Sequence, residues 1–282
     1  MVDNRYATQP YYVPEQHRSR FDASSGLWQP VNMPELPHRR GVAGAALDDP
    51  EALAAMTFDQ YQQWGALDWK APHGTAAAAE RWADKIMEEG VTEVLAEYAR
   101  LEPGDNKPFD EKLIDEQGDV LFIAAAAATT VSKSLMHAVR LRLRDQYVAI
   151  RPPQPITLRM VDDLMADGFQ PHPLGGVVVE DYDDDPWGDD ELAPDINWAL
   201  LSAGIANKLR SGIVRRGPEK YFDPRPDQAH AIGGMAADAT LFIAYTARRY
   251  GGSNLQEVVR HNFAKVGQRV SLNQIDKTDN PR

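Results

Sequence analysis

The chain has 282 residues, of which 43% are hydrophobic, carries no cysteine, and has a formal net charge of −12. This length allows one large domain or two small ones with a well-formed core. The absence of cysteine excludes disulfides and thiolate metal sites, and the acidic balance argues against a nucleic-acid duplex as the main partner.

The apolar segments are short. The longest run, residues 120–128, is under half of the roughly 20 residues that a membrane-spanning helix needs. The opening residues 1–14 are polar and rich in tyrosine and proline, unlike a secretion signal. These features predict a cytoplasmic protein without membrane contact.

Residues 1–55 are rich in proline and show no sustained hydrophobic period, which predicts an extended N-terminal arm. A helical pattern begins at "TFDQYQQW", where Thr57 precedes Gln60 by three residues, the spacing of a capping box. Further helices are predicted over residues 75–101, 111–130 and 134–147. The prolines of "RPPQP" at 151–155 then end this first set of four.

A second set of helices follows the linker. The pattern predicts a helix starting near Thr157 and others over residues 197–214, 229–249 and 255–270. Between the first two lie a short hairpin candidate and an acidic loop at 180–195. This loop lacks the ligand spacing of a calcium loop and is interpreted as a solvated segment.

A repeat relates the two sets. The tetrapeptide L-F-I-A occurs at 121–124 and again at 241–244, in the third helix of each set. Together with the matching helix order, it predicts a diverged internal duplication. The expected fold is all-α, with two four-helix units (56–150 and 151–282) fused in tandem as a pseudo-dimer behind the arm.

Two pairs of acids could carry chemistry. Glu89 and Glu93 share one helical face, as do Glu116 and Asp119. Brought opposite each other by a helical hairpin, the four carboxylates would repel unless a divalent cation lay among them, and Mg²⁺ suits oxygen ligands. The alternative is surface charge, or first-turn acids favoured by a helix dipole. Gly118, costly inside a helix, indicates the close approach of another group.

Rival sites have weaker support. A di-iron bundle needs Glu-x-x-His pairs on helices, and the only such pair, Glu35 and His38, encloses Pro37. There is no G-x-x-x-x-G-K phosphate loop.

The motifs resemble those of a family, the MazG-like and dimeric dUTPase-like all-α nucleoside triphosphate pyrophosphohydrolases. "EEGVTE" at 88–93 and "EQGD" at 116–119 are similar to the family's E-E-x-x-E and E-x-x-D patterns. "GGSNLQEVVRHNFAKVGQR" resembles the family's ending and places Asn262, Lys265 and Arg269 at its matching positions.

This sequence departs from the family pattern at three places. The first motif has one residue too many, so either Glu88 or Glu89 is the first ligand. The second set keeps Asp238 but has Met235 in place of the glutamate, and only this set carries the family's ending. These departures suggest that one copy keeps the acids, the other keeps the Asn-Lys-Arg helix, and a composite site forms between them.

The resemblance implies Mg²⁺-dependent (or Mn²⁺-dependent) cleavage of a nucleoside or deoxynucleoside triphosphate to the monophosphate and pyrophosphate. Glu89, Glu93, Glu116 and Asp119 would hold the metal, with Glu89 or Glu116 as general base. Asn262, Lys265 and Arg269 would contact the nucleotide, unless the two cations merely complement a helix dipole. The alternatives are a helical scaffold without turnover and a nucleotide-binding sensor. Homo-oligomers, the family's usual assembly, stay open.

Overall fold

A computed structural model describes residues 19–22, 27–30, 49–66, 76–104, 106–146, 148–150, 154–171, 194–213, 222 and 224–271. Most of the predicted N-terminal arm, the Glu35–His38 pair and the acidic loop at 180–195 lie outside these residues. So does the side chain of Arg269, although its backbone belongs to the last helix. The regular structure of the described residues is almost entirely helical, which confirms the all-α class.

The N-terminal region contributes two short strands and one helix. β1 (Ser19–Asp22) pairs antiparallel with β2 (Leu27–Pro30). Helix α2 (Pro50–Ala54) was not predicted, although its signals are in the sequence. The Asp49 side chain accepts hydrogen bonds from the first N–H groups, and Pro50 begins the helix.

The first helical set follows the predicted order. α3 (Phe58–Ala66) begins with the expected capping box, in which Thr57 and Gln60 exchange hydrogen bonds of 2.8 and 3.2 Å. α4 (Ala76–Met87) continues through a π-helical segment, η3 (Glu88–Glu93), into α5 (Val94–Tyr98). α6 (Glu111–Thr130) has the predicted bounds, and α7 (Leu135–Asp145) is capped by Ser134.

The second set repeats this order. Thr157 caps α8 (Leu158–Ala166), and α9 (Pro194–Ser211), α10 (Pro226–Arg249) and α11 (Leu255–Ser271) follow. α9 and α10 each begin three residues before the predicted start, because Pro194 and Pro226 occupy first-turn positions that proline tolerates.

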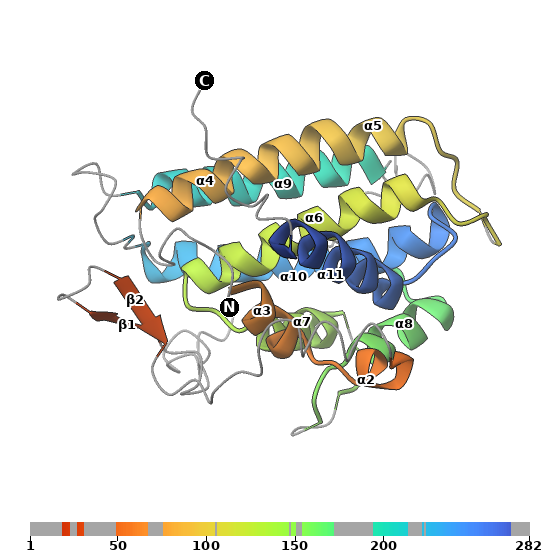
Figure 1. Cartoon of the computed structure of the whole chain (residues 1–282), viewed down its shortest axis with the longest axis horizontal. Helices are drawn as coiled ribbons and strands as arrows, with labels where there is room; N and C mark the ends of the chain where they lie inside the picture. Colours follow the sequence, from red (N-terminus) through yellow and green to blue (C-terminus); the bar gives the residue numbers. More distant parts are fainter. Residues whose placement is uncertain are drawn as a thin grey trace, which may run out of the picture.

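The helices form three layers (Figure 1). The α4–η3–α5 helix lies along α9 at the top of this view, and α6 lies along α10 in the middle. α11 packs against α6, while α7 packs against α10. The alanines at 124–128 are all buried, and their small side chains allow neighbouring helices to approach α6 closely.

Contacts at the starts of the helices are repeated between the two sets. Thr57 and Thr157 form an antiparallel β-bridge directly before α3 and α8. On α3, the Gln62 side chain accepts a hydrogen bond of 2.8 Å from the first N–H of α7, that of Leu135. On α8, Asp162 accepts one of 2.7 Å from the first N–H of α11, that of Leu255. In both sets the side chain five residues after the bridged threonine therefore holds a helix start.

Within the described residues no single helix is both long and apolar enough to cross a membrane. α6 and α7 meet this criterion only as a pair, and the pair is bent by 104° at the turn between them.

Candidate metal centre

Three of the four predicted acids come together. One carboxylate oxygen from each of Glu89, Glu93 and Glu116 lies within 4.8 Å of the others, and all three side chains are partly buried. Glu89 and Glu93 project from η3, and Glu116 projects from the second turn of α6, against which η3 packs. Three carboxylates at this spacing offer the oxygen ligands that Mg²⁺ or Mn²⁺ prefers.

The π-helical segment determines how the first two acids point. The N–H of Val94 bonds to the carbonyl of Glu89, five residues earlier, so η3 holds one residue more than an α-helix would over the same turn. Gly90 within η3 faces α9, where a Cβ would lie 2.3 Å from the Ser202 Oγ. The sequence predicted an uninterrupted α-helix here, because its periodicity does not report this tertiary contact.

Glu89, rather than Glu88, belongs to the cluster. The Glu88 side chain is 57% exposed and pairs with Lys85 at 2.7 Å, whereas that of Glu89 is 13% exposed. Lys85 also reaches Glu89, at 3.3 Å. Lys85 was missed by sequence reasoning, although its position four residues before Glu89 places it on the same helical face.

The pKa values of Glu89 and Glu93 show that holding these carboxylates together in ionised form costs free energy. Burial, and then the nearby charge of Asp119, raises the pKa of Glu89 to about 7. Burial also raises the pKa of Glu93, and its contact with Glu116 adds to the rise. Like charges held together in a partly buried site raise one another's pKa, and a divalent cation would relieve this repulsion. The donor set therefore fits such an ion.

Asp119 lies beside the cluster and has a cation of its own. Its Oδ2 is 2.8 Å from the Nζ of Lys265 on α11, and its side chain is 14% exposed. Lys265 has a raised pKa despite its burial, because Asp119 and then Asp115 and Glu116 favour its charged form. The second helical set thus supplies a cation to the acids of the first.

Gly118 makes this approach of α11 feasible. A Cβ at Gly118 would lie 3.1 Å from the Cβ of Asn262 and 3.4 Å from the Val258 carbonyl oxygen. The close approach expected at Gly118 is confirmed. Asn262 itself is buried, with 1% exposed, and accepts a hydrogen bond of 3.0 Å from the Tyr61 hydroxyl. Its amide nitrogen is buried without a hydrogen-bond partner among the described residues.

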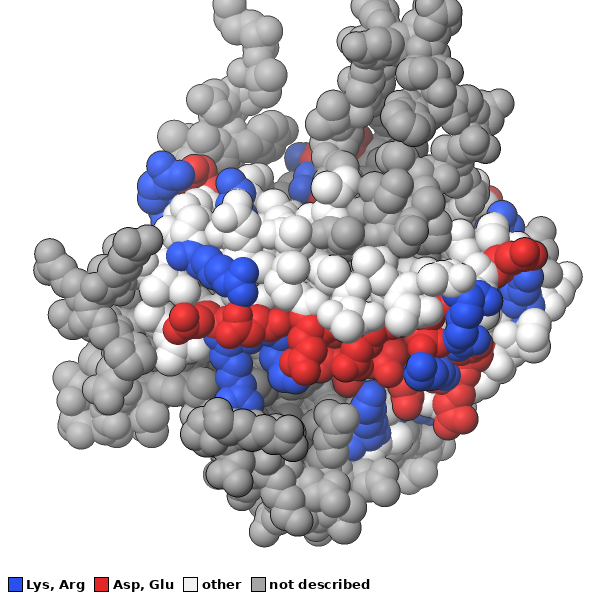
Figure 2. All heavy atoms as spheres, turned by 90° about the horizontal axis from the view of Figure 1, so that it is seen from above, with Lys and Arg blue, Asp and Glu red and all other residues white. Residues whose placement is uncertain are grey.

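One further acid near the cluster already has cationic partners. Glu97 on α5 is 2% exposed and forms ion pairs with both Arg100 and Lys112. Figure 2, which shows the molecule from above the view of Figure 1, shows a band of acidic side chains with lysine and arginine side chains beside it. Asp115 lies 3.3 Å from the His261 ring, a contact between α6 and α11 that sequence reasoning also missed.

No protein-family model, curated protein or solved structure matches the chain. The chemistry of the site therefore rests on the residues themselves.

Proposed function

We propose that the chain is a Mg²⁺-dependent nucleoside triphosphate pyrophosphohydrolase, which uses water to cleave a nucleoside or deoxynucleoside triphosphate into its monophosphate and pyrophosphate. The observation that most supports this proposal is that carboxylate oxygens of Glu89, Glu93 and Glu116 lie within 4.8 Å of one another. The resemblance of "EEGVTE" and "EQGD" to the family motifs supports the reaction class. A cytoplasmic location, where such substrates are abundant, is part of the proposal.

The π-helical segment supports the family interpretation of the first motif. That motif has one residue more than the family pattern, and η3 is the turn that accommodates one additional residue. Glu89 and Glu93 consequently both reach Glu116 although they are four residues apart.

In this proposal Glu89, Glu93 and Glu116 hold the metal, with Asp119 as a fourth ligand when Lys265 moves to the substrate. A bound Mg²⁺ neutralises phosphate charge and lowers the pKa of water. Glu89, whose pKa is raised to about 7, is suited to accept a proton from the attacking water near neutral pH. Lys265 and Arg269 on α11 would bind phosphate oxygens.

Asn262, which the resemblance implies as a nucleotide contact, takes a positioning role in this proposal instead, because its side chain is 1% exposed. Its side chain is buried against Gly118 and bonded to Tyr61, so it holds α11 at the distance that lets Lys265 reach Asp119.

We also propose that the fold is a tandem pseudo-dimer of MazG-like units. The β-bridge of Thr57 with Thr157 and the matched hydrogen bonds to Leu135 and Leu255 support it. So does the packing of equivalent helices on each other, α4 on α9 and α6 on α10. The metal ligands would then come from one unit and Lys265 from the other.

A sensor that binds nucleotide without turnover is the second candidate. The ion pair of Lys265 with Asp119 favours it, because this pair removes one acid from the ligand set. Binding of nucleotide with Mg²⁺ but without release of pyrophosphate would select this alternative.

The deciding experiment is to incubate the full chain with Mg²⁺ and each of the eight common ribo- and deoxyribonucleoside triphosphates and to measure pyrophosphate. Glu116→Gln is expected to abolish its release while the far-UV circular dichroism stays unchanged. Glu111→Gln, an exposed acid on the same helix, is the matched control and is expected to retain activity. Absence of both turnover and Mg²⁺-dependent binding with all eight would refute the function.

A further inference from the structure

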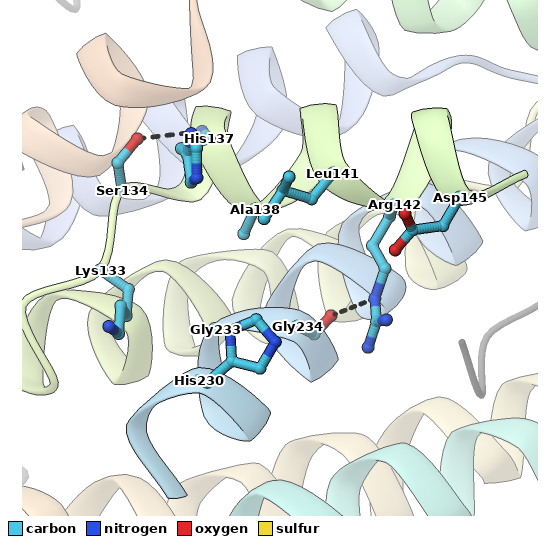
Figure 3. A pocket seen from close by; sticks show the side chains of 10 residues that line it. All are labelled: Lys133, Ser134, His137, Ala138, Leu141, Arg142, Asp145, His230, Gly233 and Gly234. Carbon is cyan, nitrogen blue, oxygen red and sulfur yellow. Dashed lines mark hydrogen bonds between the residues drawn. The ribbon is translucent and has the colours of Figure 1, made fainter. Parts of the chain in front are cut away.

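A pocket lies between α7 and α10, whereas the acid cluster lies on η3 and α6. It is lined by Lys133, His137, Arg142, Asp145 and His230, together with two glycines of α10. Figure 3 shows Lys133 and Arg142 at its two sides, with His137 above and His230 below. The cavity volume is about 50 Å³, and the cavity is partly open to solvent.

Two adjacent glycines of α10 make room for the cations. A Cβ at Gly233 would lie 3.2 Å from the Lys133 Cγ, and one at Gly234 would lie 2.6 Å from an Nη of Arg142. Glycine inside a helix costs about 1 kcal/mol relative to alanine. The pair therefore gives up helix stability at the two positions where Lys133 and Arg142 lie against the helix.

The guanidinium of Arg142 is fixed through one nitrogen. Its Nε lies 2.9 Å from the Oδ1 of buried Asp238 and donates a longer hydrogen bond of 3.4 Å to the Gly234 carbonyl. Both contacts use Nε, and within the described part of the chain no ion pair or hydrogen bond occupies its Nη groups. Arginine held in this way can offer its remaining N–H groups to an oxyanion.

The charges around the pocket favour an anion. Asp145 also lines it, but its carboxylate lies 3.4 Å from Arg144, which offsets its charge. His230 is faced by Lys133, Arg142 and Asp145, and its pKa is lowered by burial first and then by the two cations.

His137 on α7 is also surrounded mainly by cations. It is faced by Arg140, Lys133, Arg144 and Asp59, and burial followed by Arg140 lowers its pKa. A bound anion would offset this repulsion among like charges.

We propose that the α7–α10 pocket binds a phosphoryl anion, either free phosphate or pyrophosphate or the phosphate of a nucleotide. Lys133 and Arg142 would contact its oxygens from two sides, and His230 would donate from α10. The site is separate from the acid cluster, since none of the pocket residues belongs to η3 or α6's acidic turn. Its existence does not depend on the proposed hydrolysis.

The test uses the full chain in EDTA, which prevents metal-dependent binding at the acid cluster. Phosphate, pyrophosphate and adenosine monophosphate are titrated by calorimetry at constant ionic strength, and the histidine Cε1–H resonances are followed by NMR. We expect saturable binding, and we expect the pKa values of His137 and His230 to rise in phosphate relative to chloride. The tightest of the three anions identifies the source of the phosphoryl group.

Variants assign the site. Lys133→Gln and His230→Gln are each expected to weaken binding by about tenfold or more, since a charge-assisted hydrogen bond is lost. Gly234→Ala retains every charge but displaces the Arg142 guanidinium, and it should also weaken binding. Arg159→Gln, a surface cation of α8, is the control and should bind as the wild type does.

The proposal is overturned if no anion gives saturable heat and both histidine pKa values are the same in phosphate and chloride. That comparison uses the unmodified protein, so it holds even if a variant fails to fold. It is also overturned if folded Lys133→Gln and His230→Gln bind phosphate as the wild type does. Glu116→Gln should retain phosphate binding in EDTA, which separates failure of this site from failure of the proposed hydrolase.

Discussion

The α6–α11 and α7–α10 junctions are built alike but carry different charges. In the first, an aspartate of α6, Asp119, pairs with Lys265 of α11 next to three further carboxylates. In the second, an aspartate of α10, Asp238, pairs with Arg142 of α7 beside Lys133 and two histidines. Similar helix packing thus surrounds the proposed cation site at one junction and the proposed anion site at the other.

The residues around the two aspartates explain this difference in charge. Asp119 lies near Glu89 and raises the pKa of that carboxyl, a repulsion that a divalent cation would relieve. Asp238 has no glutamate one turn before it, because Met235 occupies that position. Asp238 and Asp145 each lie beside an arginine, and Lys133, Arg142 and two histidines line the pocket for which we propose an anion.

The largest expected effect separates two adjacent glutamates of η3. Glu89→Gln should lower pyrophosphate release by roughly a thousandfold, because a metal ligand and the proposed base are lost. Glu88→Gln should change it by less than about threefold, since Glu88 is exposed outside the cluster. Steady-state assays of both variants test the assignment, and similar losses in the two would reject it. Neither should alter phosphate binding at the α7–α10 pocket.

A second comparison sets Gly90 against Gly234. Gly90→Ala should lower the free energy of unfolding by about 1–3 kcal/mol, because its Cβ would lie 2.3 Å from the Ser202 Oγ. Gly234→Ala should cost less than Gly90→Ala, since the contacting atom is the far end of the Arg142 side chain and alanine favours the helix. Urea denaturation measures both.

Ser202→Ala sharpens the same test. The Ser202 hydroxyl is buried without a hydrogen-bond partner among the described residues, so its removal alone should be neutral or stabilising. Combined with Gly90→Ala, it should recover part of the lost stability. Strict additivity in this double-mutant cycle would contradict the close packing of η3 against α9.

Metal and pH should change the stability contributed by the α6–α11 and α7–α10 junctions in different ways. The raised pKa values of Glu89 and Asp238, both about 7, mean that the folded chain binds protons which the unfolded chain releases above about pH 4. Without metal, stability should therefore fall as pH rises from about 4.5 to 7. Mg²⁺ should raise the melting temperature more at pH 8 than at pH 5, because it binds the ionised carboxylates.

Two substitutions show how much each junction contributes to the dependence of stability on pH and Mg²⁺. Glu89→Gln should remove most of the Mg²⁺ effect on the melting temperature, whereas Asp238→Asn should reduce the fall with pH and leave the Mg²⁺ effect intact. Calorimetric melting temperatures at both pH values provide the measurement. An equal Mg²⁺ effect at pH 5 and pH 8 would count against a carboxylate metal site.

Lys265→Gln should have a smaller effect, and it should change the affinities for Mg²⁺ and for nucleotide in opposite directions. Removing the ammonium from Asp119 should strengthen Mg²⁺ binding by roughly threefold to tenfold, since a competing cation is gone. Nucleotide affinity should fall in the same variant, because a phosphate contact is lost. Calorimetric titrations of each ligand test this, and unchanged Mg²⁺ affinity would show that Lys265 does not compete for Asp119.

The smallest expected effect comes from Lys85→Gln. Lys85 lowers the pKa of Glu89, against burial and Asp119, so its loss should move the acid limb of the pH–rate profile to higher pH by a fraction of a unit. A shift to lower pH would exclude Glu89 as the base.

The sequence predicted the parts of this structure that local patterns determine. The capping box of α3 and both ends of α6 follow from residue types near each terminus. The convergence of Glu89, Glu93 and Glu116 was accessible because helical spacing places each pair on one face. Asp119 was identified for the same reason, but its partner Lys265 lies 146 positions away and could be inferred only from the resemblance.

The remaining features depend on contacts between distant segments. At the π-helical turn Gly90 packs closely against Ser202 of α9, and periodicity along α4 does not contain that information. The α7–α10 pocket joins His137 with His230, and neither histidine has a neighbour in sequence that marks it as part of a site. Glu97 has the same residue type as the candidate ligands, and only its ion pairs with Arg100 and Lys112 separate it from them.

The π-helical turn also sets the rotational phase of everything that follows it in the helix. An α-helix turns by about 100° per residue, so if the same residues of η3 were wound as a regular α-helix, α5 would be rotated by roughly that angle relative to α4. Glu97 would then turn away from Lys112, and Tyr98 from the Thr246 hydroxyl to which it donates a hydrogen bond of 2.7 Å. The π turn takes up the additional residue and so keeps two separate sets of contacts, the acid cluster and the Glu97–Tyr98 contacts, in register along a single helix.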